Sequence, residues 1–134
     1  MTNKMKKYKN YKILCEKLKD SRKHNYYYES LFIERLIIED RVNSILKSLK
    51  VANKNRANMS LKEKIKLILT QNNPIINKYL TKQVKNSLIQ WDFLFNSFIS
   101  NVANKVLDEK KIEQLVKNGA NLEKKIDLLS KKFK

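Results

Sequence analysis

Glycine and proline are nearly absent from this sequence. Its 134 residues include one of each, Gly119 and Pro74. Folds of this size that contain β-sheets normally need several glycines and prolines for their tight turns. The scarcity therefore argues against an all-β or a doubly wound α/β fold and favours long helices with few connections. Hydrophobic residues make up 42% of the chain, which is enough for one core, so we expect a single helical domain over residues 1–134.

Side chains that bind metals or act as nucleophiles are also scarce. The single cysteine, Cys15, excludes an internal disulfide and a zinc site with several cysteines. The single histidine, His24, excludes a histidine-rich metal site. The lone Gly119 cannot form a glycine-rich phosphate loop. The sequence therefore predicts neither a metal nor a cofactor, and the spacing of Cys15 and His24 carries no specific sign of a catalytic pair.

Long apolar runs are missing as well. No run of 18 apolar residues occurs, so we expect no transmembrane segment. Residues 1–12 are basic, but the apolar stretch and the cleavage site of a secretory signal peptide do not follow them. We therefore expect a cytoplasmic protein.

Positive charge is what the sequence has in excess. Thirty lysines and arginines against 13 acidic residues give a net charge of +17. This predicts an anionic partner, and we favour RNA over DNA or a membrane surface. The excess lies in residues 1–28, with nine basic and two acidic side chains, and in residues 47–85, with ten and one. Residues 29–46, in contrast, carry two basic and four acidic side chains.

The spacing of apolar residues predicts about five helices in an up-and-down bundle. Residues 1–25, a basic helix and a polar joint, are expected at its periphery. The second helix is apolar nearly all round in its N-terminal half, so it should be central or face a second subunit. The expected helices are 4–20, 26–49, 61–70, 76–106 and a last one that follows Asp108.

Local signals mark several of the expected helix ends. Ser60 and Glu63 have the spacing of a capping box, and Asp108 should cap the last helix. The sequence Asn72-Asn73-Pro74 should interrupt helical structure, because the residue before proline disfavours the α conformation. Gly119 falls inside the last helix. Either the backbone packs closely there or the helix breaks into two.

The basic regions contain the candidate contacts to nucleic acid. Their lysines fall on the solvent-facing sides of the expected helices, where they could bind phosphates. A basic and aromatic stretch at residues 22–28 adds tyrosines that could stack on bases. Ordinary solvated helix faces are the alternative interpretation. The candidates are Lys62, Lys66, Lys82, Lys85, Arg22 and Lys23.

The second helix also carries charges beside its apolar stripe. Arg35 and Glu39 are four residues apart, and Glu34 and Arg41 are seven apart. Such residues usually form pairs along one helix or extend to solvent. A polar pocket where the second helix meets the fourth is the other interpretation.

Two stretches resemble the HEPN superfamily, small helical bundles that include RNases of toxin–antitoxin, CRISPR and abortive-infection systems. Residues 26–46, YYYESLFIERLIIEDRVNSIL, are similar to an aromatic and then acidic helix found in some members. Residues 89–132 resemble the helix that carries the motif Arg-Asn-x-x-x-His and the charged helix after it. Together the two stretches cover about half of the chain. The resemblance implies a helical bundle with affinity for RNA.

The sequence departs from that motif at both catalytic positions. Phe95 stands where the family has arginine, Asn96 keeps the asparagine, and Ser100 stands where the family has histidine. Phe95 cannot act on a 2′-hydroxyl or a phosphate, and serine is a poor general base without an activating neighbour. The resemblance therefore implies a non-catalytic member that keeps the bundle, a dimer surface and RNA affinity.

The leading hypothesis is a non-catalytic RNA-binding protein of a phage-defence, toxin–antitoxin or CRISPR-related system. A homodimer through the apolar sides of the second and fourth helices is expected with it. Two alternatives stay open. One is a metal-independent RNase that uses Arg41, Asn96 and His24. The other is a small interaction or inhibitor protein that acts on a nucleoprotein complex.

Overall fold

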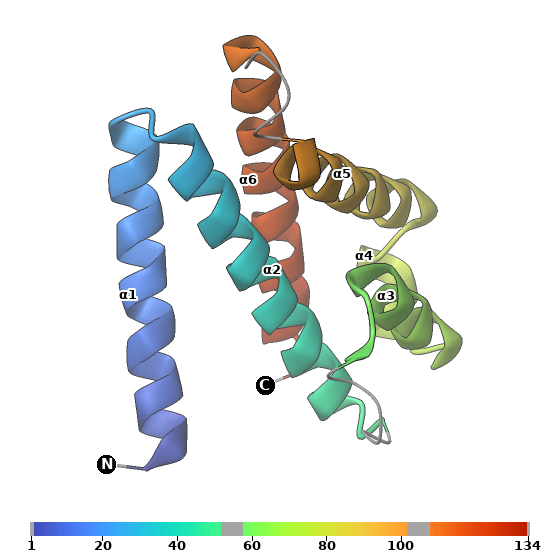
Figure 1. The fold of residues 1–134 in the computed structure, drawn as a ribbon. Helices are drawn as coiled ribbons and strands as arrows, with labels where there is room; N and C mark the ends of the chain where they lie inside the picture. The colour runs from blue at the N-terminus through green and yellow to red at the C-terminus, as the bar shows by residue number, and fades with distance from the viewer. Residues whose placement is uncertain (1, 52–57, 102–107, 134) are drawn as a thin grey trace.

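The computed structural model describes residues 2–51, 58–101 and 108–133, and in these ranges the chain is helical with no strand (Figure 1). The prediction of an all-α bundle is confirmed. The described residues form six helices where the sequence predicted about five. They are α1 Asn3–Lys23, α2 Tyr27–Ser48, α3 Leu61–Thr70, α4 Pro74–Tyr79, α5 Lys82–Asn101 and α6 Glu109–Lys131.

Helix α2 occupies the centre of the molecule. It packs against α6 along most of its length and against α1 on another side (Figure 1). Helices α1 and α2 run in opposite directions, whereas α2 and α6 run in the same direction. Helices α3, α4 and α5 lie on the side of α2 away from α1, and α5 crosses α6. The central position of α2 explains the burial of apolar residues on more than one of its sides.

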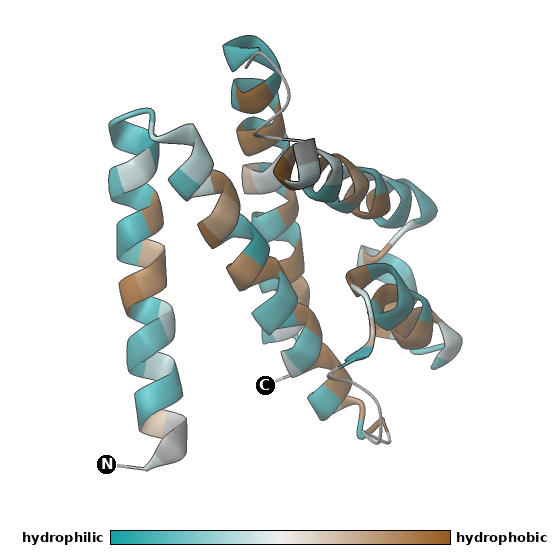
Figure 2. Ribbon diagram, viewed as in Figure 1, coloured by the Kyte–Doolittle hydropathy of each residue, from teal (hydrophilic) through white to brown (hydrophobic). Residues whose placement is uncertain are grey.

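The main core joins α2 to α3, α4, α5 and α6. Figure 2 shows apolar residues on the helices that meet there, whereas α1 is largely hydrophilic. Burying each large side chain of this kind contributes about 1.5–3 kcal/mol. The fully buried side chains include Leu31, Ile38, Ile45, Leu46, Leu61, Ile65, Ile68, Ile76, Leu88, Trp91 and Ile126.

A second, smaller cluster holds α1. Leu18 of α1 packs against Ile33 and Ile37 of α2, with Leu14 and Cys15 around them. This contact covers a side of α2 that the main core does not use. Phe32 and Leu36 stay 47% and 55% exposed, so the N-terminal half of α2 is not covered all round.

The predicted N-caps of α3 and α6 are present. The Ser60 hydroxyl accepts a hydrogen bond from the Glu63 backbone N–H at 3.1 Å. The Asp108 carboxylate accepts from the backbone N–H groups of Lys110 and Lys111. Each cap satisfies a donor that the helix itself leaves unpaired. Helix α3 has the bounds that the sequence predicted.

Two predicted connections differ from the structure. The polar joint expected at residues 21–25 is shorter, because α1 continues to Lys23 and only the next two residues turn the chain. The expected long helix 76–106 is divided into α4 and α5. Thr81 begins α5, since its hydroxyl accepts from the Val84 N–H at 3.3 Å. Residues 52–57 of the predicted loop and residues 102–106 of that helix lie outside the described ranges.

Gly119 lies inside an unbroken α6 and is buried. A β-carbon at this position would lie 2.3 Å from Glu34 Oε1 and 2.9 Å from Trp91 Nε1. Close backbone packing is therefore the correct alternative, and a break into two helices is wrong. Over the described part of the chain, no helix has the length and hydropathy needed to cross a membrane.

Candidate nucleic-acid interface

The three arginines in the described ranges bind carboxylates inside the fold. Arg22, Arg35 and Arg41 have side chains only 28%, 16% and 7% exposed, and each forms an ion pair. Their partners are among the least exposed acidic side chains of the protein. The arginines in the described ranges are therefore bound to carboxylates, Arg22 and Arg35 across helices and Arg41 within α2, whereas most described lysines are exposed.

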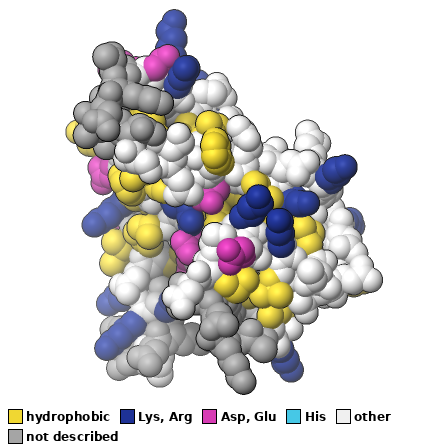
Figure 3. Space-filling view, turned by 45° about the vertical axis from the view of Figure 1, so that its right-hand side comes forward, with side chains coloured by type: hydrophobic (Ala, Val, Ile, Leu, Met, Phe, Trp, Pro, Cys, Tyr) yellow, Lys and Arg dark blue, Asp and Glu magenta, His cyan; other side chains and the backbone are white. Residues whose placement is uncertain are grey.

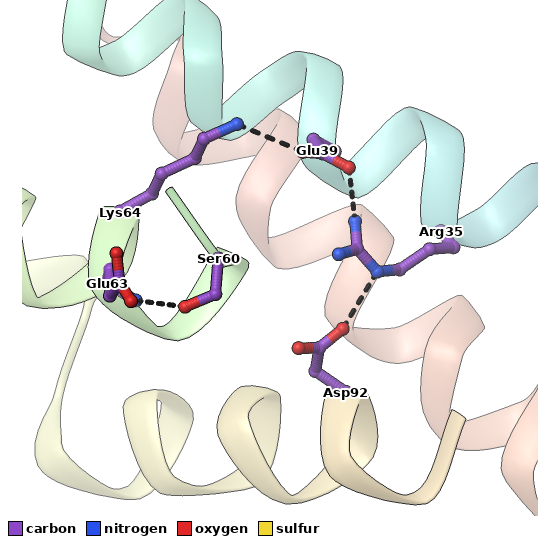
Figure 4. A network of polar contacts seen from close by, with 6 residues as sticks. All are labelled: Arg35, Glu39, Ser60, Glu63, Lys64 and Asp92. Atoms are coloured by element: carbon purple, nitrogen blue, oxygen red, sulfur yellow. Dashed lines mark hydrogen bonds and ion pairs between the residues drawn. The ribbon is translucent and has the colours of Figure 1, made fainter. Parts of the chain in front are cut away.

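Arg35 is the centre of a network that joins three helices (Figure 4). Its Nε donates to Asp92 of α5 at 2.8 Å, and its Nη1 donates to Glu39 of α2 at 2.7 Å. Glu39 also accepts from the buried Lys64 of α3 at 3.0 Å. Burial favours a raised pKa of Glu39, but Lys64 and Arg35 outweigh this and hold the pKa below its usual value. The predicted Arg35–Glu39 pair along α2 is present. Asp92 of α5 and Lys64 of α3 extend it into a network of ion pairs.

Lys64 and Asp92 were not singled out from the sequence, although a signal was present. Lys64 lies between Leu61 and Ile65 on the apolar side of α3, and Asp92 lies between Trp91 and Phe95 on the apolar side of α5. A charged residue at a core position needs a partner, because an unpaired buried charge is costly. Which partner it finds depends on the tertiary arrangement.

Removing Asp92 should weaken the fold more than removing an exposed acid. Asp92→Ala leaves the Nε of Arg35, whose side chain is 16% exposed, without its carboxylate, so we expect a loss of about 1–2 kcal/mol of unfolding free energy. Glu113→Ala is the control, because it breaks the exposed Glu113–Lys117 pair on α6 and should cost below about 0.5 kcal/mol. Urea unfolding followed by circular dichroism measures both. Equal effects would contradict the structural role of the network.

Arg22 binds two acidic side chains at the junction of α1, α2 and α6. Its Nη2 lies 2.9 Å from Glu34 Oε2 and 3.5 Å from Glu123 Oε2. Glu34 is fully buried. Burial raises the pKa of Glu34 to about 7 although Arg22 opposes the shift, and burial also raises the pKa of Glu123. The guanidinium of Arg22 is thus bound to carboxyl groups inside the fold, and we do not count Arg22 among the exposed basic side chains of the candidate interface.

The three candidate catalytic residues, Arg41, Asn96 and His24, lie on different elements of the fold. His24 is exposed in the turn after α1, where its Nδ1 lies 2.9 Å from the Asp20 carbonyl oxygen and its ring stacks on Tyr26. Arg41 lies 14 residues after Tyr27, the first residue of α2. This corresponds to about 21 Å along the helix axis and separates Arg41 from the turn that contains His24.

Arg41 is buried, binds Asp40, and its guanidinium lies 4.2 Å from the ring centre of Tyr11. Asn96 is exposed on α5. Next to it, Phe95 is 7% exposed and its ring stacks on Trp91 with 5.7 Å between ring centres, whereas Ser100 is exposed. In the described ranges no group of three His, Cys, Asp or Glu side chains is placed to hold a metal ion.

The predicted lysines lie on the outside of α3 and α5, which pack against each other. Lys62, Lys66 and Lys82 are exposed, and Lys85 is half-buried. None of the four has an ion-pair partner among the described residues. Figure 3 shows a group of lysine or arginine side chains on the face turned toward the viewer, with acidic side chains directly beside it. Lys23 is exposed in the last turn of α1.

Comparisons with known proteins gave no match. No family model, no curated protein and no solved structure matches the chain.

Proposed function

We propose that this protein binds RNA without cleaving it, through lysines on the outside of the bundle. The observation that carries the proposal is the imbalance of exposed charge. Twenty lysines are exposed in the described ranges, and few carboxylates lie among them to offset their charge. The exposed acidic residues there are Glu16, Asp20, Glu29, Glu63, Asp108 and Glu109.

A polyanion is the partner that such a surface fits best. The exposed ammonium groups repel one another, and each phosphate contact releases counterions and relieves this repulsion. The three arginines in the described ranges, a residue type that forms the most specific phosphate contacts, are engaged with carboxylates. Binding mainly through lysines supports affinity with little sequence preference.

We further propose a non-catalytic relative of the HEPN bundles. The buried Phe95 and the separation of His24 from Arg41 support the non-catalytic part of this proposal. Phe32 and Leu36, exposed beside each other on α2, support a homodimer or a protein partner within a nucleoprotein complex. A phage-defence, toxin–antitoxin or CRISPR-related setting is the role we propose for such a protein.

The test removes four positive charges from α3 and α5. The variant carries alanine at positions 62, 66, 82 and 85, and it should bind single-stranded RNA at least about tenfold more weakly than the wild type. The dependence of log K on log salt should become shallower by about 3, because each lost phosphate contact accounts for about 0.7. Titrations at about 50 and 200 mM salt measure both quantities.

The matched control removes the same charge from α6, with alanine at Lys110, Lys111, Lys124 and Lys125. All four are exposed, so this variant should lose less affinity if the interface lies on α3 and α5. The titrations contain EDTA, and a gel shows whether the RNA stays intact. Cleaved RNA, or no binding by the wild type at low salt, would overturn the proposal. Equal losses in both variants would place the interface elsewhere on the basic surface.

A further inference from the structure

The outer side of α5 differs from the other exposed helix faces. Its buried side consists of Leu88, Trp91 and Phe95. The positions opposite them recur at intervals of three and four residues along the helix and place basic, amide and aromatic side chains in one strip. We call these residues the α5 strip: Lys82, Lys85, Asn86, Gln90 and Phe93.

The α5 strip contains no negative charge. The one acidic residue of α5 is Asp92, which is 7% exposed and bound to Arg35. The outer face of α1, in contrast, mixes its lysines with the exposed Glu16 and Asp20. Helix α3 carries the exposed Glu63. An anion that approaches the α5 strip therefore meets cations and no carboxylate within the strip itself.

Phe93 is the unusual member of the strip. Its side chain is 65% exposed, although α5 buries Trp91 and Phe95 and half-buries its remaining aromatic residue, Phe98. A single exposed apolar residue is common on protein surfaces. Here, however, it lies three helical turns from Lys82 and next to the amide of Gln90. A cation, an amide and an exposed ring in one row can contact the phosphate, the edge and the face of a nucleotide.

We propose that the α5 strip binds a single-stranded segment of RNA, with Lys82 and Lys85 at phosphates and Phe93 stacked on an unpaired base. This inference rests on the proposed RNA binding. It adds that the bound RNA is single-stranded and that Phe93 contacts one of its bases. Lys82 and Phe93 are separated by about 16 Å along the helix, which leaves room for a few nucleotides. Duplex RNA keeps its bases stacked on one another, so Phe93 cannot reach their faces.

The experiment compares wild type and Phe93→Ala with three probes. These are a uridine oligonucleotide, an abasic oligonucleotide of the same length, and a duplex RNA. Stacking of one base contributes an amount that corresponds to about 5- to 150-fold in affinity. We expect Phe93→Ala to lose affinity in this range for the uridine oligonucleotide and to bind the other two probes as the wild type does. Phe93→Trp should keep the affinity, because it keeps a stacking ring.

Two controls separate the strip from general effects. Leu128→Ala on α6 removes another exposed apolar side chain, 51% exposed, and should leave all three affinities unchanged. Lys82→Ala/Lys85→Ala should weaken binding more than Lys124→Ala/Lys125→Ala, which removes the same charge from α6. If the wild type binds none of the probes, the proposed function fails. If it binds the uridine oligonucleotide and Phe93→Ala binds equally well, the function stands and the α5 strip is wrong.

Discussion

Replacing Gly119 with alanine should destabilise the protein by about 2–3 kcal/mol, although alanine is the better helix former. In an open helix this change would stabilise by about 1 kcal/mol. At Gly119 the new β-carbon would lie 2.3 Å from Glu34 Oε1 and 2.9 Å from Trp91 Nε1. Neither neighbour can move easily. Glu34 is fully buried and held by Arg22, and the indole N–H of Trp91 donates to the Leu115 carbonyl oxygen at 2.9 Å.

Asn121→Ala measures the helix-forming contribution at an exposed position of the same helix. It should stabilise slightly, by about 0.5 kcal/mol, because nothing crowds its side chain. Thermal and urea unfolding of both variants therefore give shifts of opposite sign. A Gly119→Ala variant that is as stable as Asn121→Ala, or more stable than wild type, would refute close packing of α6 against Glu34 and Trp91.

Local signals in the sequence were enough to predict most helices and several of their ends. The caps at Ser60 and Asp108 depend on side chains within three residues, so they could be read directly. The break at Thr81 was missed because Leu80, Val84 and Leu88 keep helical spacing across it. The apolar period indicates which side is buried, and it does not show whether the helix axis continues.

The candidate site was only partly predictable, for a different reason. Exposed lysines such as Lys62 and Lys66 follow from the helix period, because their positions lie opposite the apolar side of α3. Arg22 looked equally available in the sequence, yet it binds Glu34 and Glu123, which lie on two other helices. Pairing between distant residues is set by the packing of helices, and no local pattern encodes it. Phe93 lies off the apolar spacing of Leu88, Trp91 and Phe95, so the sequence could indicate its exposure, but an isolated exposed apolar residue does not by itself indicate a ligand.

The stability of the protein should fall as pH rises from about 5 to 8, and Glu34 should be a main cause. The pKa of Glu34 is about 7 in the fold, against 4.5 for an ordinary glutamate. Between these values the unfolded chain has released this proton while the folded protein still holds it. Unfolding then releases a proton, so stability is full below about 4.5 and is lost as pH rises through about 7. The shift corresponds to roughly 3 kcal/mol.

Glu123 and Glu39 also contribute to the dependence of stability on pH. The pKa of Glu123 is also raised by burial, so Glu123 adds to the loss at higher pH. The pKa of Glu39 is lowered, and its contribution is lost on the acid side as pH falls through its folded value. Stability should therefore be greatest on the acidic side of neutrality, at a pH where Glu39 is ionised and Glu34 is protonated.

Glu34→Gln isolates the contribution of Glu34, because glutamine keeps the shape of the protonated carboxyl and does not titrate. Urea unfolding at pH 5, 6, 7 and 8 should show that the variant loses less stability across this range than the wild type, by about 2 kcal/mol. Glu29→Gln, an exposed glutamate in the first turn of the same helix, should keep the wild-type profile. If Glu34→Gln falls as steeply as the wild type, the buried carboxyl is not the group that titrates. The pH dependence would then be assigned to Glu123, the other carboxyl that binds Arg22.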